Sequence, residues 1–270
     1  MKHFLMLLVF IGTSVCTGEP ISSSLGARGM ALVFQHAETN YTAADYVQEG
    51  LVCIWDAIEN SDWGVHDDSA TAWTELVSGT ADPIVGVFGT RYAWSDNALV
   101  SYTDGNTFTS DRTDILLEPF QTCTFTLEST TSAPTASHTW QPQIFNICKS
   151  GQGYAQGLIL RYRRENNGVC GNVYTGTYTS GPSITVSPLD ALHTWTCSYN
   201  EGVGSFYADG LYVGGATVNP DQTITSTIVR IGSSSYQFQG CYHSLRIYNR
   251  ALTADEAAHN AQVDKARFGL

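Results

Sequence analysis

The stretch HTWTCSYNEGVGSFYADGLYVGG, residues 193–215, decides the fold of this chain. Its aromatic residues alternate with small polar residues, which is the period of a β-strand that buries one face. Asp209 and Gly210 lie between two apolar runs and form the strongest short hairpin signal in the sequence. The stretch therefore predicts three consecutive antiparallel strands. Its two carboxylates, on Glu201 and Asp209, are interpreted as turn residues rather than as chemical groups.

The rest of the chain repeats this pattern of short apolar runs separated by Gly, Asp, Asn, Ser and Pro. No run of strands alternates with helices in a βαβ order. The pattern predicts an all-β chain, a two-sheet antiparallel jelly-roll sandwich. Besides residues 193–215, the expected strands are 50–58, 71–77, 84–89, 97–103, 113–118, 122–128, 141–148, 157–164, 168–179, 183–186, 227–232 and 242–250.

One helix is expected, near the end of the sequence. Thr253 and Glu256 in LTADEAAHN have the spacing of a capping box, in which each residue satisfies a backbone N–H of the other. Several alanines follow at helix-forming positions, and Phe268 is available to anchor the end. We expect a short helix over about residues 254–265.

The N-terminus has the anatomy of a secretory signal peptide. Lys2 and His3 precede an apolar run from Phe4 to Ile11, and small residues follow. We expect a signal peptide over 1–18, a flexible lead-in over 19–48 and one jelly-roll domain over 49–270. The apolar run is too short to span a bilayer comfortably. The predicted location is therefore secreted or on the cell surface, without membrane insertion.

The charge of the chain limits its partners. The formal net charge is −12 with 13 Lys and Arg among 270 residues, so a nucleic-acid backbone would be repelled. A neutral ligand is compatible with this charge. Six cysteines remain after the signal peptide, which is an even number that permits disulfides. Buried thiols are the favoured interpretation, since Cys53 and Cys197 stand where a core alanine or valine would fit.

Several motifs in order resemble the concanavalin A-like lectin/glucanase superfamily, in its laminin-G-like branch. The Trp-led strand and Tyr-x-Asp-Gly hairpin of residues 193–215 come first, and VRIGSSSYQFQGCYHSLRIYNRALTADEAAHN follows at 229–260. GLVCIWD and HDDSATAWTELVSG resemble the first strand and the next loop of the family more weakly. The resemblance implies a two-sheet jelly roll. One departure is His243, which stands where the family often has an aspartate.

Glucanases of this superfamily carry Glu-x-Asp-x-Glu on one strand, so that alternate carboxylates face one cleft. The sequence lacks this pattern. Glu128 has Thr126 and Thr130 as its same-face neighbours, while Asp56 and Glu59 are expected to point to opposite faces of a strand. No G-x-S-x-G, P-loop or HExxH motif is present either. These observations favour a protein without catalytic activity.

Sugar binding needs aromatic faces together with polar groups, and loops between rigid strands are the usual place. Tyr92 and Trp94 lie in the turn-rich GTRYAWSDN, and Trp140 is similarly placed in SHTWQPQ. Arg161 and Tyr162 lie on opposite faces of one expected strand. These five residues are the candidate carbohydrate contacts. Aromatic residues in sandwiches also fill the core, and that interpretation stays open for each of them.

Asp67 and Asp68 in GVHDDSA are candidate oxygen ligands for calcium, which takes six to eight such ligands. A solvated loop or turn is the favoured interpretation. The resemblance adds weight to calcium because many laminin-G-like domains bind a structural ion. No other cofactor is expected.

The sequence thus predicts a secreted, non-catalytic carbohydrate-binding module. A protein-binding adhesin or a structural module of a cell or virion surface is the alternative, and a glycoside hydrolase is a third. The expected partners are accordingly a glycan or a cell-surface protein. Fold alone does not separate these functions, because function resides in sites grafted onto folds.

Overall fold

The computed structural model describes a folded unit that begins after residue 40. The described residues are 41–82, 92–95, 97–101, 108–110, 124–132, 143–148, 157–163, 168–174, 178–185, 191–217, 228–231 and 238–269. The expected signal peptide, the expected strands 84–89 and 113–118 and the candidate Trp140 lie outside them. Within the described residues no helix is both long and apolar enough to span a membrane.

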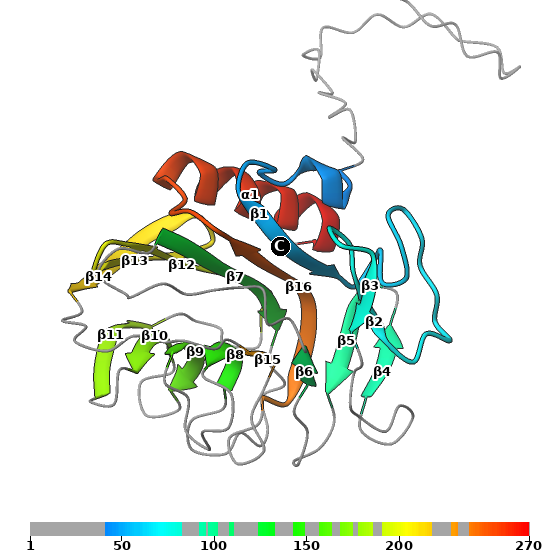
Figure 1. Cartoon of the computed structure of the whole chain (residues 1–270), viewed down its shortest axis with the longest axis horizontal. Helices are drawn as coiled ribbons and strands as arrows, with labels where there is room; N and C mark the ends of the chain where they lie inside the picture. Colours follow the sequence, from blue (N-terminus) through cyan, green and yellow to red (C-terminus); the bar gives the residue numbers. More distant parts are fainter. Residues whose placement is uncertain are drawn as a thin grey trace, which may run out of the picture. The chain divides into compact units, whose positions relative to one another are not determined.

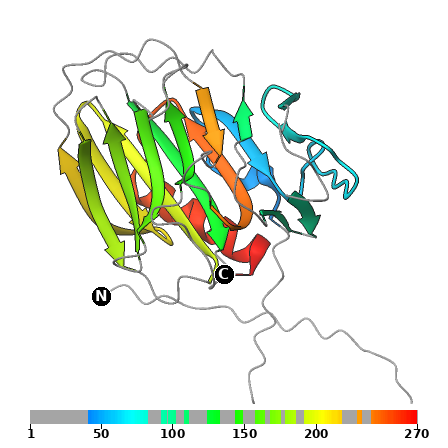
Figure 2. The same cartoon turned by 90° about the horizontal axis from the view of Figure 1, so that it is seen from below.

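Two antiparallel sheets stack face to face, as Figure 1 shows from the side and Figure 2 from below. The larger sheet has the order β14 (Leu211–Thr217), β13 (Val203–Ala208), β12 (His193–Asn200), β7 (Thr124–Ser132), β16 (Gly240–Tyr248), β5 (Ala98–Ser101), β4 (Tyr92–Ser95). β1 (Leu51–Asp56) also pairs with β16.

The smaller sheet runs in the order β11 (Tyr178–Thr185), β10 (Gly168–Tyr174), β9 (Gly157–Arg163), β8 (Gln143–Cys148), β15 (Ile228–Ile231), β6 (Phe108–Ser110). A separate hairpin joins β2 (Trp73–Glu75) to β3 (Thr80–Asp82). A 3-10 turn, η1 (Ala43–Asp45), precedes β1, and helix α1 spans Ala254–Phe268. The predicted all-β sandwich with one helix is confirmed.

Residues 193–215 form the predicted meander. β12, β13 and β14 pair in turn and are joined by two-residue turns. Glu201 and Gly202 have φ of 44° and 88°, and Asp209 and Gly210 have φ of 50° and 78°. Positive φ at both central residues marks the hairpin turns whose twist matches that of the strands. The carboxylate of Asp209 accepts the backbone N–H of Thr194 at 2.9 Å, so it serves the turn as predicted.

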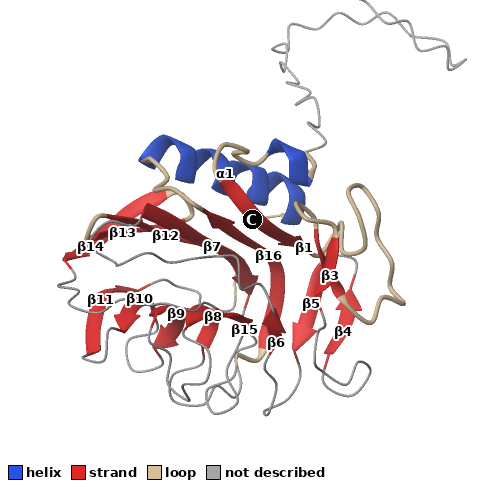
Figure 3. Cartoon of the chain, in the orientation of Figure 1, coloured by secondary structure: helices blue, strands red, loops and turns tan. Residues whose placement is uncertain are grey.

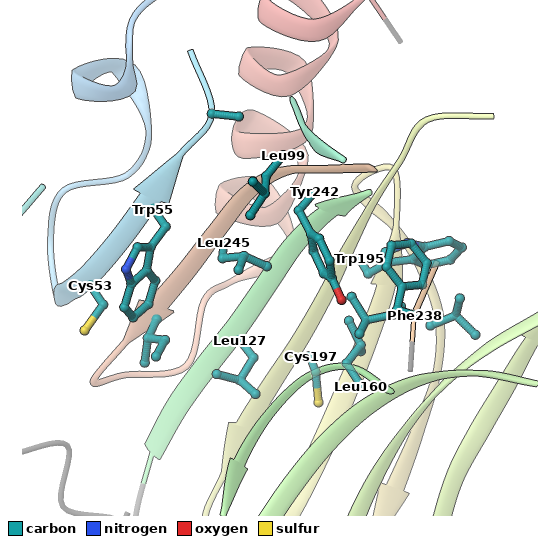
Figure 4. Close-up of a cluster of buried hydrophobic side chains, with 14 of the residues drawn as sticks. Cys53, Trp55, Leu99, Leu127, Leu160, Trp195, Cys197, Phe238, Tyr242 and Leu245 are labelled. Carbon is teal, nitrogen blue, oxygen red and sulfur yellow. The ribbon is translucent and has the colours of Figure 1, made fainter. Parts of the chain in front are cut away.

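A hydrophobic core fills the space between the two sheets (Figure 4). Trp55 from β1 and Trp195 from β12 are each 1% exposed, which confirms the sequence assignment of both indoles to the core. The side chains of Cys53 and Cys197 are buried, as predicted, and that of Cys241 is half-buried. The larger sheet supplies most of the described core, and Ile144, Leu160 and Val169 complete it from the smaller sheet.

Helix α1 covers the outer face of the larger sheet (Figure 3). Its capping box between Thr253 and Glu256 is present as predicted. The helix runs to Phe268, beyond the expected end near 265, because Val263 and Phe268 are buried against the fold. The polar face of β12 is consequently buried as well, since Thr194 lies under the helix and is 0% exposed.

The expected lead-in over 19–48 is too long. The structure places residues 41–48 in the folded unit, where Ala43 is 0% and Tyr46 2% exposed. The hydroxyl of Tyr46 donates to Asp264 at 2.7 Å, and the backbone N–H of Val47 donates to Asn260 at 2.9 Å. Individual hydrogen bonds, rather than a periodic pattern of apolar residues, hold this segment in place. Because it lacks such a pattern, its sequence resembles that of a flexible lead-in.

Candidate ligand-binding face

The long loop between β1 and β2, residues 57–72, exposes a tryptophan on a tight turn. Asp62 and Val65 form an isolated bridge around Trp63 and Gly64, and the N–H of Val65 donates to the carbonyl of Asp62 at 2.9 Å. Gly64 has φ of +70°, a value that glycine adopts without strain. Trp63 therefore occupies the tip of the turn, where 39% of its surface is exposed.

The indole of Trp63 is fixed although it is exposed. Its Nε1–H donates to the carbonyl of Leu76 at 2.8 Å, which joins the turn to the end of β2. The backbone N–H of Trp63 donates to the carboxylate of Asp62 at 2.7 Å. Because the polar atom of the indole is already bonded, the residue offers its apolar ring to solvent. Val65 on the same turn and Val77, the residue after Leu76, are also exposed, at 46% and 47%.

Two buried polar side chains anchor this loop to the sandwich. The carboxylate of Glu59 accepts the N–H of Gly64 at 2.8 Å and the N–H of Ala43 at 2.7 Å. The amide of Asn60, which is 0% exposed, exchanges two hydrogen bonds with the backbone of Asp67, at 2.8 and 2.9 Å. The Trp63 turn is thus held from below by groups that are shielded from water.

Three aspartates lie on the same loop as Trp63. Asp62 precedes Trp63 directly, and the side chain of Asp68 is 77% exposed while it contacts His66 at 2.9 Å. Asp67 accepts from the hydroxyl of Ser69 at 2.6 Å, and this hydrogen bond lowers the pKa of Asp67. We call the exposed side chains of Asp62, Trp63, Val65, Asp68 and Val77 the Trp63 face.

Asp67 and Asp68, the candidate calcium ligands, therefore close a small turn and contact a histidine. Among the described residues, no group of three or more His, Cys, Asp or Glu side chains is arranged to hold a metal ion. Carbonyl oxygens and water contribute to calcium sites as well. Calcium binding stays a prediction.

The structure brings one of the predicted carbohydrate contacts near this loop. Trp94 on β4 is half-buried, and its Nε1–H donates to the carbonyl of Ala70 at 2.7 Å. Its ring meets that of Trp73 edge-on, with 5.7 Å between the centroids. Tyr92, on the same strand, is only 1% exposed and belongs to the core, so its ring is not offered to a ligand.

The structure describes the backbone of two of the remaining candidates. Arg161 and Tyr162 lie on β9 of the smaller sheet, opposite Cys170 and Val169 of β10. The side chain of Arg161 is half-buried, and that of Tyr162 lies outside the described side chains, as does all of Trp140.

Sequence reasoning missed Trp63. The signal was present in NSDWGVHDD, where a tryptophan stands between Asp62 and Gly64. Asp and Gly are turn residues, and a turn between strands lies on the surface. A tryptophan at that position is therefore exposed unless another element covers it.

Two buried carboxylates, one on β7 and one on helix α1, serve the fold. Glu128 is 0% exposed on the outer face of β7, where Arg246 donates to it at 3.0 Å and Thr196 donates at 2.7 Å. Asp264 of helix α1 receives two hydrogen bonds from the Arg246 guanidinium, at 2.9 and 2.7 Å. Burial raises the pKa of Glu128. For Asp264 burial acts in the same direction, but the pairing with Arg246 outweighs it and the pKa lies below its usual value.

Asp56 and Glu59 were expected to point to opposite faces of a strand, and this was wrong. β1 ends at Asp56 and the chain turns, so both carboxylates reach one guanidinium. Nη2 of Arg267 donates to Asp56 at 2.8 Å and to Glu59 at 3.0 Å. Through Arg267, helix α1 is thus joined to the end of β1 and to the start of the loop that carries Trp63.

His243, at the position of the family aspartate, is a packed residue that is 6% exposed. Its Nδ1–H donates to the carbonyl of Asn97 at 2.7 Å, and its Nε2 accepts from the hydroxyl of Ser132 at 3.3 Å. Its ring lies 5.3 Å from that of Phe268. Burial lowers the pKa of His243 to about 4, so the imidazole is neutral near pH 7.

Comparison with solved structures shows what shares this architecture. The sialidase of Trypanosoma rangeli, solved in complex with sialic acid, matches with a TM-score of 0.58 and 14% identity over 80% of this chain. The binding domain of botulinum neurotoxin serotype D matches with a TM-score of 0.57 and 13% identity over 79%. The serotype G binding domain gives a TM-score of 0.56 and 11% identity over 71%. At these identities the likeness shows the fold alone.

The chain is much shorter than these structures, since the match covers 33% of the sialidase and 50% and 48% of the serotype D and serotype G chains. No curated protein matches the sequence. A family model described as the concanavalin A-like lectin/glucanases superfamily matches residues 113–258, which is more than half of the chain. With its two stacked antiparallel sheets and the laminin-G-type order of its motifs, this chain belongs to the concanavalin A-like lectin/glucanase superfamily.

Proposed function

We propose that this protein is a secreted, non-catalytic glycan-binding module that contacts its ligand through the Trp63 face. The observation that carries the proposal is an exposed tryptophan that is immobilised. Trp63 is 39% exposed, yet its indole is bonded to Leu76 and its turn is held by the buried Glu59. A rigid aromatic ring gives a large contact area with little loss of side-chain entropy.

The indole ring and the carboxylates of this loop are chemical groups of the kinds that bind a sugar. One side of a pyranose is apolar and packs on an aromatic surface, while its hydroxyls donate to oxygen acceptors. Ionised carboxylates are strong acceptors of such hydrogen bonds, and Asp62 and Asp68 are exposed on the same loop. The Trp63 face therefore combines an apolar platform with acceptors at its rim.

The internal roles of three buried carboxylates support binding rather than hydrolysis. A general acid or nucleophile must reach the scissile bond. Glu128, Asp264 and Glu75 are each 0% exposed and accept hydrogen bonds from other parts of the fold. The lectin/glucanase superfamily contains both activities, and these internal roles favour the first. Secretion rests on the N-terminal sequence, in which Lys2 precedes the apolar run.

Glycan-array binding of the full chain tests the proposal. We expect a subset of glycans to bind, and Trp63→Ala to reduce that binding by about tenfold or more, because loss of a central Trp typically costs above 1 kcal/mol. Tyr212→Ala is the matched control, since Tyr212 is an aromatic residue on β14 that is 61% exposed. Binding that is unchanged in Trp63→Ala would refute the assigned face.

The same array with and without a calcium chelator tests the calcium prediction for Asp67 and Asp68. A calcium-dependent site would lose binding in the chelator. If Asp67→Asn and Asp68→Asn also abolish the calcium response, the two carboxylates are assigned as ligands.

One observation favours the second candidate, a protein-binding module. β14 pairs only with β13 among the described strands, and its Leu211, Tyr212 and Val213 are 72%, 61% and 39% exposed. An exposed apolar edge strand is suited to pairing with an extended segment of another protein. If Tyr212→Ala weakens attachment to cells while Trp63→Ala does not, the protein-binding function replaces the glycan-binding one.

A further inference from the structure

We infer that the Trp63 face selects glycans by charge: it binds cationic, free-amine sugars more tightly than their N-acetylated counterparts and disfavours sialylated or sulfated ones. This inference rests on the proposed glycan-binding function and adds the chemical class of the ligand. It comes from the charges that lie on and around one loop.

The first observation is a one-sided charge pattern. From residue 29 to residue 90 the sequence has no Lys or Arg. The loop itself carries Asp62, Asp67 and Asp68, of which Asp62 and Asp68 are exposed and Asp67 is half-buried. Any ligand that stacks on Trp63 therefore meets carboxylates before it meets a basic side chain from this part of the chain.

The second observation concerns the arginine that contacts the base of the loop. The side chain of Arg267 is 2% exposed, and its Nη2 donates to Asp56 and Glu59. One buried guanidinium thus faces two buried carboxylates, and it has no charge to offer to a ligand at the surface. On the same loop Asp68 contacts the imidazole of His66 at 2.9 Å, whereas the carboxylate of Asp62 bonds to a backbone N–H and has no Lys or Arg on the loop to compensate its charge.

The third observation is the geometry of the ring. Asp62 lies next to Trp63 in sequence, and its carboxylate accepts the Trp63 backbone N–H at 2.7 Å, so this charge is held at the backbone of the exposed tryptophan. A protonated amine near an indole gains cation–π attraction in addition to the attraction of the carboxylate. An N-acetyl group in the same place has neither contribution, and a sialic acid carboxylate or a sulfate is repelled.

Titration calorimetry with matched sugars tests the inference on the full chain. The probes are a glucosamine oligomer, the N-acetylglucosamine oligomer of the same length, and a sulfated oligomer of similar length. The measurement is made at about pH 5.5, where an Asp carboxyl is ionised and an amine is protonated. We expect the free-amine oligomer to bind about two- to tenfold more tightly than the N-acetylated one, the range that two exposed charge contacts give.

Two variants establish which charges are responsible. The double variant Asp62→Asn and Asp68→Asn keeps the side-chain size and the acceptor oxygen at Asp62 but removes both charges. We expect it to abolish the preference for the amine, so that the free-amine and N-acetylated oligomers bind with about the same affinity. Asp255→Asn, which removes an exposed carboxylate from helix α1, is the control and is expected to preserve the preference. Raised salt is expected to weaken only the binding of the free-amine oligomer.

The outcomes separate this inference from the function on which it rests. If glycans bind and Trp63→Ala weakens them, but the sulfated oligomer binds as tightly as the free-amine one, charge selection is wrong and glycan binding stands. A preference that survives in the Asp62 and Asp68 double variant overturns the inference in the same way. If no glycan binds to the native chain, the glycan-binding function fails and this inference fails with it.

Discussion

Gly210 lies where the β13–β14 hairpin meets helix α1. Its φ is +78°, and a Cβ atom placed on it would lie 2.6 Å from the Cα of Ala258. The glycine is thus required twice, once by the backbone conformation of the turn and once by the close approach of the helix. The Asp-Gly pair that reveals the hairpin in the sequence is also a contact point for the helix, which the sequence does not show.

We expect Gly210→Ala to lower the free energy of unfolding by about 2–5 kcal/mol, from the left-handed backbone and from the clash with Ala258. Gly79→Ala is the matched control, because Gly79 has φ of +67° but a Cβ atom placed on it would meet no atom within 4 Å. Gly79→Ala is expected to lower the free energy of unfolding only by the cost of the left-handed backbone, about 1–2 kcal/mol. Equal losses for both variants in urea unfolding would show that the helix contact is unimportant.

His243 makes stability depend on pH in a defined window. Its pKa is lowered from 6.5 to about 4 by burial in the folded state, so between these values the unfolded chain binds the additional proton. The free energy of unfolding therefore falls as the pH drops from about 6.5 to about 4. The slope from one such proton reaches at most about 1.4 kcal/mol per pH unit.

Removing the imidazole isolates this contribution. We expect His243→Gln to flatten the pH dependence of stability between about pH 6.5 and pH 4 relative to the native chain. Other groups that titrate in this range, such as Asp56, whose pKa burial raises to about 6, are present in both proteins and cancel in the difference. His259→Gln, on the exposed side of α1, controls for the substitution itself. An unchanged slope for His243→Gln would contradict the argument.

At the scale of elements, helix α1 is attached through buried ions rather than through a broad apolar face. Arg246 of β16 is 0% exposed and pairs with both Glu128 of β7 and Asp264 of α1. The ring of Tyr46 lies 4.0 Å from its guanidinium carbon. A buried ion cluster of this kind is costly to break, because removing one partner leaves another charge without compensation.

We expect Asp264→Asn to lower the free energy of unfolding by about 3–5 kcal/mol, the usual cost of removing one partner of a buried pair. Asp255→Asn removes an exposed charge from the same helix and is expected to cost about 1 kcal/mol or less. Hydrogen exchange of the α1 amides provides a local readout, with faster exchange expected only in Asp264→Asn. Similar behaviour of the two variants would mean that the cluster does not hold the helix.

At the scale of the whole molecule, the predictions that succeeded depend on residues close in sequence. The hairpin at Asp209 and Gly210 and the capping box of Thr253 and Glu256 are each defined within four positions. Local chemistry of this type is independent of what packs against it. The order of such motifs was enough to identify the two-sheet fold and the superfamily.

The predictions that failed depend on contacts between distant residues. Residues 41–48 were expected to be flexible, whereas Tyr46 docks on Asp264, which lies far along the chain. The alternation in β12 predicts one buried face, whereas the helix buries the other face as well. Tyr92 and Trp94 are neighbours on one short strand, yet one is in the core and the other is half-buried. No local pattern distinguishes such cases.

The ion cluster under helix α1 also has a consequence for the order of events during synthesis. The strands that carry Glu128 and Arg246 leave the ribosome before residue 264 does, so the nascent sheet first exists with one guanidinium and one carboxylate beneath an uncovered outer face. The second carboxylate, that of Asp264, becomes available to Arg246 only when the helix has emerged. Helix α1 therefore acts as the closing element, and the outer face of the larger sheet stays uncovered until the helix docks.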